Sequence, residues 1–220
     1  MPKGFTDREK KLIRERLIKE GYKQFSAYGL KKTNVEELAE AARISKGAFY
    51  LFYESKEALF MDVVELAEQR YRQEILAAID LPGPSPRARL LVVFKKAFDL
   101  LKKIPVLQFF TGRDYDLLFR KIPAEKLQEH LASDQLFFKE LVMRCQNAGI
   151  AIRVQPEELS GLLYLLVLAI MHEDDLSLNH FSSSIDLLLE LIAAFCLGEV
   201  EIELQRPISP APDVVTWGRT

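Results

Sequence analysis

The spacing of apolar residues predicts a long first helix. Between residues 7 and 28, apolar side chains recur every three to four positions, as expected for one face of a helix. Thr6 or Asp7 can cap the start of this helix, and acidic residues follow in its first turn. Gly29 stands where a helix end favours a residue in the left-handed region. We therefore expect the first helix to end next to Gly29.

Three capping patterns predict shorter helices after this glycine. Thr33 and Glu36 have the spacing of a capping box, which would open a short helix. A break follows at Arg43, and Ser45 can cap a second short helix. Ser55 can cap a longer helix that is expected to reach about residue 80.

The remaining chain also predicts helices. Residues 81–86 contain three prolines and a glycine, which cannot continue a helix, so they are expected to form a linker. Apolar periodicity and breaks at Pro105, Pro123, Gly149 and Pro156 predict further helices over 87–103, 123–147, 156–172 and 183–197, with a helical or irregular aromatic segment over 106–121. No strand and no internal repeat is evident, so the predicted fold class is all-α.

We expect two domains on this pattern. Residues 1–56 would form a helix-turn-helix domain, and the helix from about 55 to 80 would connect it to the rest. Residues 81–205 would form a second helical domain, and residues 206–220, with three prolines and little pattern, a loose tail.

Composition places the chain among ordinary globular proteins. Its 220 residues are 49% hydrophobic and 28% charged, which excludes a disordered chain and a disulfide scaffold. The apolar stretch from Leu159 to Met171 is too short to cross a bilayer, and the N-terminus lacks the apolar segment of a signal peptide. We therefore expect a cytoplasmic protein without membrane contact, in which Cys145 and Cys196 are buried thiols.

Charge is divided unevenly along the chain. Residues 1–56 carry a net charge of +5, whereas residues 57–220 carry −7. A basic N-terminal quarter on an acidic body favours a polyanionic partner at that end. A charged helix face that only interacts with solvent would give the same numbers, so charge alone leaves both interpretations open.

The N-terminal helices together carry a recognisable pattern. A long helix braces two short capped helices joined by a tight turn, which is a helix-turn-helix unit. The segments 29–39, 44–53 and 55–59 read GLKKTNVEELA, ISKGAFYLFY and SKEAL. These segments closely resemble the N-terminal domain of TetR (tetracycline-repressor-like) transcription regulators and match nearly every signature position. The resemblance covers about a quarter of the chain.

The resemblance implies a DNA-contacting surface on this unit. In DNA-binding versions, the second short helix enters the major groove, where base edges are distinguishable. Thr33 would cap the first short helix and touch a phosphate, Tyr50 and Lys56 would also touch phosphates, and Gly47 would let the helix approach closely. The implied DNA-binding residues are Thr33, Asn34, Arg43, Ser45, Lys46, Gly47, Ala48, Tyr50, Leu51 and Lys56.

Three departures from the family pattern involve four positions. Arg43 stands where glycine is most common, and a left-handed conformation there would cost about 1 kcal/mol. Phe52 and Tyr53 exchange the usual aromatic types, which keeps their packing. Leu51 places an apolar side chain on the recognition helix, where a thymine methyl is a suitable contact.

The resemblance also implies that the second domain binds a ligand and forms a homodimer. The almost continuously apolar helices 156–172 and 183–197 suit a two-fold four-helix interface, with Leu163, Val167, Ile170, Leu188, Leu191 and Phe195 as its expected residues. An aromatic group suits an apolar or aromatic effector; its members are Phe94, Phe98, Phe109, Phe110, Tyr115, Phe119 and Phe137. The same residues would also suit a filled core.

Other chemistry is sparse. We find no nucleophile with a partner base, no phosphate-binding loop and no cofactor motif, so no catalytic or metal-ligating residues are expected. The run His172-Glu173-Asp174-Asp175 together with His180 forms only a weak metal pattern, because a loop of acidic residues between two helices is more often solvated. His130 is expected to stand alone. The sequence thus predicts a dimeric repressor that binds a palindromic double-stranded operator and is released by a small molecule. A helical ligand-binding protein or enzyme without sequence-specific DNA binding is the alternative.

Overall fold

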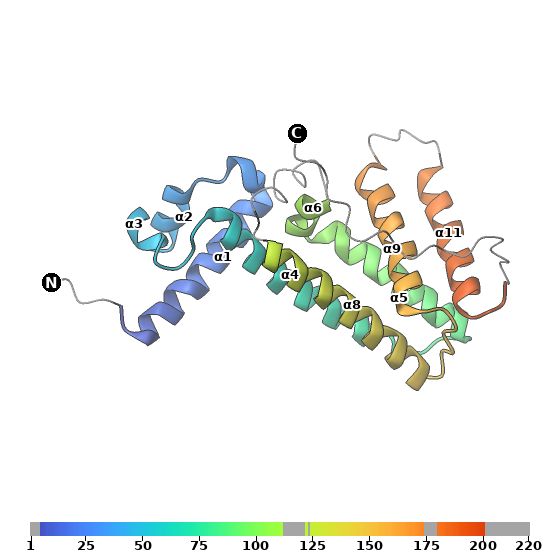
Figure 1. Cartoon of the computed structure of the whole chain (residues 1–220). Coiled ribbons are helices and arrows are strands. Elements are labelled where there is room, and N and C mark those ends of the chain that lie inside the picture. The colour runs from blue at the N-terminus through green and yellow to red at the C-terminus, as the bar shows by residue number, and fades with distance from the viewer. Residues whose placement is uncertain (1–4, 112–121, 123, 174–179, 201–220) are drawn as a thin grey trace.

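The computed structural model describes residues 5–111, 122, 124–173 and 180–200, and these residues form helices without any strand (Figure 1). This confirms the predicted all-α class. The helices are α1 (Asp7–Lys32), α2 (Val35–Ala41), α3 (Lys46–Phe49), α4 (Lys56–Ala78), α5 (Pro86–Lys103), α6 (Pro105–Thr111), α8 (Ala124–Asn147), α9 (Pro156–Met171) and α11 (Phe181–Cys196).

Most of the predicted helix caps are confirmed. Thr6 and Glu9 form a reciprocal capping box at the start of α1. The hydroxyls of Ser45 and Ser55 each accept a hydrogen bond of 3.1 Å, from the backbone N–H groups of Ala48 and Ala58. These side chains satisfy N–H groups that have no partner inside the helix, which explains why α3 and α4 begin where they do.

The predicted capping box of Thr33 and Glu36 is wrong. Gly29 has φ 72° and ψ 173°, which kinks α1 but lets helical backbone continue to Lys32. Thr33 is therefore the last cap of α1, and its buried hydroxyl donates to the Gly29 carbonyl at 2.7 Å. Asn34 caps α2 instead, because its side-chain oxygen accepts from the Glu36 N–H at 2.9 Å.

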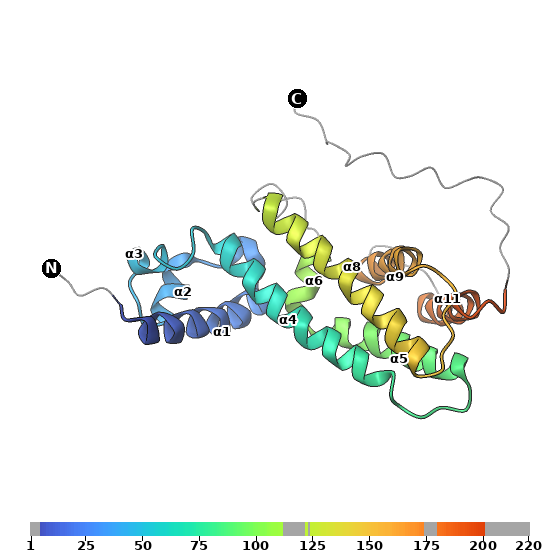
Figure 2. The same ribbon diagram turned by 60° about the horizontal axis from the view of Figure 1, so that its bottom comes forward.

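The molecule is elongated, with α1, α2 and α3 grouped at one end and α5, α8, α9 and α11 at the other (Figures 1 and 2). Helix α4 runs from one group into the other and contributes to both cores. Its first half, including Leu59 and Val63, belongs to the N-terminal apolar cluster, and its last turns, including Ile75 and Ala78, belong to the C-terminal cluster. The two groups thus share one continuous helix.

The start of α11 and the state of the two cysteines can also be compared with the predictions from the sequence. Helix α11 begins two residues earlier than predicted, at Phe181. Cys145 and Cys196 are free and buried, as predicted, and burial raises the pKa of the two thiols to about 11 and about 12. Pro123 and the tail 206–220 lie outside the described residues. Among the helices of the described ranges, none is both long and apolar enough to span a membrane.

Candidate nucleic-acid interface and cavity

The turn between α2 and α3 is held by buried apolar residues and by backbone hydrogen bonds. Arg43 has φ 62°, so the left-handed conformation that the sequence suggested is present at a residue with a Cβ. The Ile44 N–H donates to the Ala39 carbonyl at 2.9 Å across the turn. Phe49, which is fully buried, anchors α3 in the N-terminal core. These contacts fix the direction in which the outer face of α3 points.

That outer face exposes four of the predicted DNA-contacting residues. Leu51 is 74% exposed and Tyr50 is 51% exposed, with the Tyr50 ring packed edge-on against Phe49 at 5.4 Å. Lys46 is exposed and forms only a loose ion pair of 3.7 Å with Glu36. A Cβ placed on Gly47 would meet only the Ser45 hydroxyl, at 4.0 Å. The packing of the protein therefore does not require glycine at position 47.

The structure gives Thr33 and Lys56 structural contacts. The Thr33 side chain is buried and bonded to Gly29, so it does not face solvent. The Lys56 ammonium donates to the carbonyls of Thr33 at 2.8 Å and of Lys31 at 3.2 Å. Lys56 thus ties the first turn of α4 to the junction between α1 and α2. Asn34, Arg43 and Ser45 remain exposed or partly exposed beside them, and Ala48 is partly buried.

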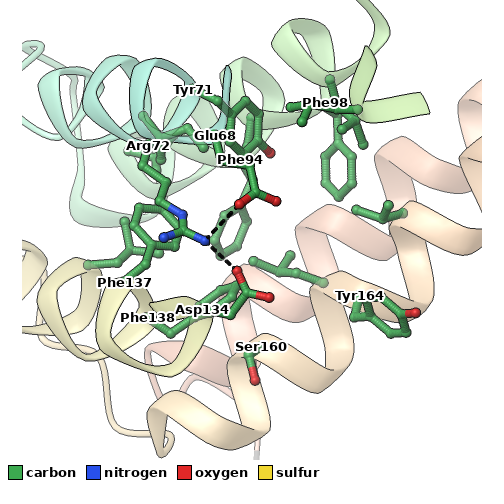
Figure 3. Close-up of a pocket in the computed structure, with 18 residues that line it drawn as sticks. Glu68, Tyr71, Arg72, Phe94, Phe98, Asp134, Phe137, Phe138, Ser160 and Tyr164 are labelled. Atoms are coloured by element: carbon green, nitrogen blue, oxygen red, sulfur yellow. Dashed lines mark hydrogen bonds and ion pairs between the residues drawn. The ribbon is translucent and has the colours of Figure 1, made fainter. Parts of the chain in front are cut away.

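A cavity of about 170 Å³ lies in the second helical group, between α4, α5, α8 and α9 (Figure 3). Its wall is mostly apolar and aromatic, and it includes Phe94, Phe98 and Phe137 of the predicted aromatic group. The core is therefore not completely filled at Phe98. Tyr115 and Phe119, and the side chains of Phe109 and Phe110, lie outside the described residues.

One corner of this cavity is polar, and sequence reasoning missed it. Arg72 of α4 donates to Asp134 of α8 at 2.6 Å and to Glu68 at 3.3 Å (Figure 3). It also donates to the Ser133 hydroxyl. Its guanidinium also lies over the Phe137 ring at 5.5 Å from the ring centre. The spacing along α4 could have indicated this polar corner. Glu68 and Arg72 are four residues apart and lie on the same helix face as the buried Ile75.

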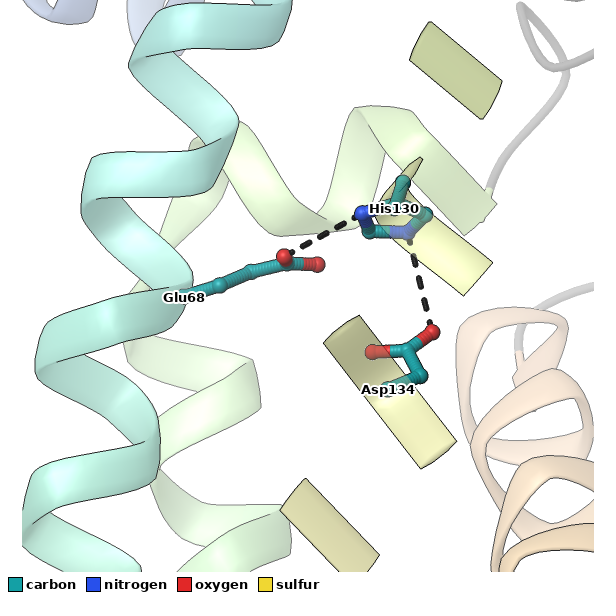
Figure 4. A group of neighbouring side chains, drawn as sticks. All are labelled: Glu68, His130 and Asp134. Atoms are coloured by element: carbon teal, nitrogen blue, oxygen red, sulfur yellow. Dashed lines mark ion pairs between the residues drawn. The ribbon is translucent and has the colours of Figure 1, made fainter. Parts of the chain in front are cut away.

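His130 does not stand alone, which corrects the sequence-based expectation. Its Nδ1 lies 3.4 Å from Glu68, and its Nε2 lies 3.7 Å from Asp134 (Figure 4). Spacing along α8 hides the Glu68 contact because this partner comes from α4. Among the described residues, Glu68, His130 and Asp134 are also the one group in which three side chains of metal-binding type each place a ligand atom within 4.8 Å of the others. The predicted pattern around His172 includes residues 174 and 175, which the structure does not describe.

Electrostatics at this corner favour bound protons. Burial raises the pKa of Asp134, and the nearby Glu68 charge raises it further. Burial acts to lower the pKa of His130, but the hydrogen bond and charge of Glu68 outweigh it, so the pKa of His130 lies above its ordinary value. Burial is thus the main cause of the Asp134 shift, whereas the two nearby carboxylates, Glu68 and Asp134, favour the protonated form of His130.

A second surface feature is an exposed apolar groove on α9 and α11, which lie side by side at the far end of the molecule (Figures 1 and 2). Leu165, Leu188 and Leu191 are 65%, 43% and 52% exposed there, and Phe195 also lines the groove. Three of the residues predicted for the dimer interface do not line this groove. Leu163 and Ile170 are buried inside the protomer, and Val167 lines the cavity, because these three residues occupy the inner side of α9.

Comparisons with known proteins agree with this architecture. The family model "Bacterial regulatory proteins, tetR family" matches residues 17–63. The chain is 30% identical over 129 residues to the Bacillus subtilis "Uncharacterized HTH-type transcriptional regulator YerO", a match that spans 57% of this chain and only 40% of that protein. It is 34% identical over 155 residues to the "Probable acrEF/envCD operon repressor" of Escherichia coli K12, which covers 66% of this chain and 67% of the repressor.

A solved structure has the same fold. The transcriptional regulator FadR from Bacillus subtilis, solved in complex with stearoyl-CoA, superposes with a TM-score of 0.56 at 14% identity, over 85% of this chain and 99% of that chain. The match to the Escherichia coli repressor extends well beyond the helix-turn-helix and covers about two thirds of each protein. The chain therefore belongs to the tetR family of bacterial regulatory proteins, whose members are transcription regulators and not enzymes.

Proposed function

We propose that this protein is a homodimeric, sequence-specific DNA-binding regulator that acts as a repressor. The observation that carries the proposal is the exposed face of α3, where Lys46, Gly47, Tyr50 and Leu51 face solvent on the basic N-terminal unit. An ammonium group suits phosphates, and an apolar side chain suits a thymine methyl in the major groove. The likeness to the Escherichia coli operon repressor supports repression as the output.

Dimerisation would supply the symmetry and the affinity that one short recognition helix lacks. The groove on α9 and α11 presents Leu165, Leu188 and Leu191 to solvent, and a second copy would cover them in a four-helix interface. A two-fold dimer would read two half-sites about 34–36 Å apart on a palindromic operator.

The cavity would hold the effector that releases the protein from DNA. Its lining residues Leu101 and Leu107 also belong to the N-terminal apolar cluster, so the cavity wall and the helix-turn-helix core share side chains. A ligand that shifts these residues or α4 would change the separation of the two recognition helices. The complex of Bacillus subtilis FadR with stearoyl-CoA supports ligand binding within this fold.

Selection from a random pool of DNA duplexes tests the proposal. The protein is incubated with the pool at moderate salt, and bound duplexes are amplified and sequenced over several rounds. We expect enrichment of a palindrome, and we expect its affinity to fall steeply as salt rises, since several phosphates are neutralised. A folded dimer that enriches no sequence would contradict the proposal and favour a ligand-binding protein without sequence-specific DNA binding.

A further inference from the structure

The wall of the cavity carries more negative than positive groups, and His130 contacts both carboxylates from outside the cavity lining. Of the charged residues that line the cavity, two are carboxylates, Glu68 and Asp134, and one is a cation, Arg72. The carboxylates come from different helices, α4 and α8, and their separation is bridged by the Arg72 guanidinium (Figure 3). The side chains of Glu68 and Arg72 are only 16% and 15% exposed, whereas that of Asp134 is 42% exposed, so water screens the Glu68 side of this corner more weakly than the Asp134 side.

The position of Arg72 marks a place built for a cation. Its guanidinium lies between the two carboxylates and over the face of Phe137, which attracts positive charge. This guanidinium belongs to a flexible side chain, and a ligand cation would compete with it for the same two carboxylates. The remaining wall, with Tyr71, Phe94 and Phe98, suits an apolar or aromatic body.

An anionic ligand fits this corner poorly. Arg72 already donates to Glu68, Asp134 and Ser133, so an anion that approached it would also meet two carboxylates. A metal ion fits poorly too, because the two ring nitrogens of His130 face different carboxylates (Figure 4). The lone pair of one nitrogen therefore does not converge with both carboxylates on one point.

We infer that the cavity binds a small organic cation with an aromatic or other apolar body, whose charged group replaces the Arg72 guanidinium between Glu68 and Asp134. The size is consistent with one ring, because a cavity of about 150 Å³ holds a benzene molecule. Displacement of Arg72 would remove the bond that joins α4 to Asp134 and Ser133 of α8. Binding of the cation does not depend on the proposed function. Only the further step, that this cation is the effector that releases the protein from DNA, rests on the proposed function.

Three compounds of the same shape and different charge test this inference by calorimetric titration of the full-length protein without DNA. Benzyltrimethylammonium is the cation, neopentylbenzene is its neutral counterpart, and phenylmethanesulfonate is the anion. We expect the cation to bind at least tenfold more tightly than the other two. Equal affinities, a preference for the sulfonate, or no binding of any of the three would overturn the inference.

Matched variants locate the binding site. Asp134→Asn should weaken cation binding at least tenfold, whereas Glu65→Gln, which removes an exposed charge one turn earlier on α4, should leave it unchanged. Because Asp134→Asn can also loosen the fold, Arg72→Gln provides the opposite test: removal of the competing cation should strengthen binding, which a misfolded protein would not do. If Arg72→Gln weakens binding in a folded protein, the inference is wrong. A protein that binds the cation but enriches no DNA sequence would retain this inference and lose the proposed function.

Discussion

At the scale of single residues, the structure of the protein has room for a side chain at Gly47. A Cβ there would have no closer neighbour than the Ser45 hydroxyl at 4.0 Å. We expect Gly47→Ala to leave the free energy of unfolding unchanged or to raise it by up to about 1 kcal/mol, because alanine favours a helix. The same change should weaken operator binding about tenfold, or about 1.4 kcal/mol, because the methyl group would face the DNA.

Urea unfolding and the fluorescence anisotropy of a labelled operator duplex measure these two effects separately. If Gly47 contacts DNA, the substitution lowers the operator affinity but does not lower the free energy of unfolding. A packing defect would lower both the operator affinity and the free energy of unfolding. Unchanged affinity in a stable Gly47→Ala protein would show that α3 does not approach DNA closely at this position.

His130 predicts how stability depends on pH. The Glu68 hydrogen bond and charge outweigh burial and raise the pKa of His130 in the folded state. The stabilisation is therefore complete below the unfolded-state value of about 6.5 and is lost as pH rises through the higher folded-state pKa. The charged groups that shift the pKa of His130 are Glu68 on α4 and Asp134 on its own helix, which raise it, and Arg72 on α4, which lowers it. Asp62, Glu65, Lys126 and Glu129 line the same hollow as His130.

Urea unfolding between pH 6 and pH 8.5 tests this dependence. The free energy of unfolding should fall across this interval in the natural protein, and the fall should be smaller in His130→Gln and in Glu68→Gln. Glu65→Gln serves as a control, since this exposed residue is not among the groups that shift the pKa of His130. A His130→Gln protein with the full pH dependence would assign the effect to another group.

At the scale of elements, Lys56 connects three helices through backbone carbonyls. Its ammonium donates to Thr33 at 2.8 Å and to Lys31 at 3.2 Å, at the junction of α1 and α2, while its backbone begins α4. Lys56→Ala should lower the free energy of unfolding by about 1.5–3 kcal/mol, the usual range for hydrogen bonds of a charged group. Urea unfolding measures this loss, and the exposed Lys32→Ala is a control that removes the same charge.

A stable Lys56→Ala protein would contradict this structural role. If its operator affinity nevertheless fell, Lys56 would act on phosphates alone, as the sequence resemblance implied. If stability falls in Lys56→Ala but not in Lys32→Ala, the carbonyl contacts are the cause.

The ends of helices could be predicted from the sequence where they depend on hydrogen bonds between residues close together in the chain. Ser45 and Ser55 cap α3 and α4 as expected, because the hydroxyl and the N–H it accepts from are three residues apart. Thr33 could not be assigned in this way, because its partner is the carbonyl of Gly29, which the kink in α1 brings into reach. The polar corner was missed for a similar reason: Arg72 and Asp134 are 62 residues apart.

At the scale of the whole molecule, α4 makes one body of the two helical groups. Its first half packs in the N-terminal cluster, its last turns pack in the C-terminal cluster, and Glu68 and Arg72 at the cavity lie between them. Leu101 and Leu107 form a second connection, because they line the cavity and pack in the N-terminal cluster. The cavity and the core of the helix-turn-helix are therefore connected by packing through α4 and through these two leucines.

The last prediction concerns the groove on α9 and α11. Leu188 is 43% exposed in the protomer, and its neighbours in the groove are also apolar, so a second copy of the chain would bury it. Leu188→Glu would place a carboxylate in this interface, where an unpaired buried charge costs several kcal/mol. We expect light scattering to give the mass of a dimer for the natural protein and about half of it for Leu188→Glu.

Leu136→Glu is the matched control for this test. Leu136 is 67% exposed on α8 and does not line the groove, so the same substitution there should leave the dimer intact. Because one half-site binds a monomer weakly, Leu188→Glu should also lose most of its affinity for a palindromic operator while its helical content is unchanged. A Leu188→Glu protein that stays dimeric would place the interface on another surface, and the two-fold arrangement of the recognition helices would then have to be built from that surface instead.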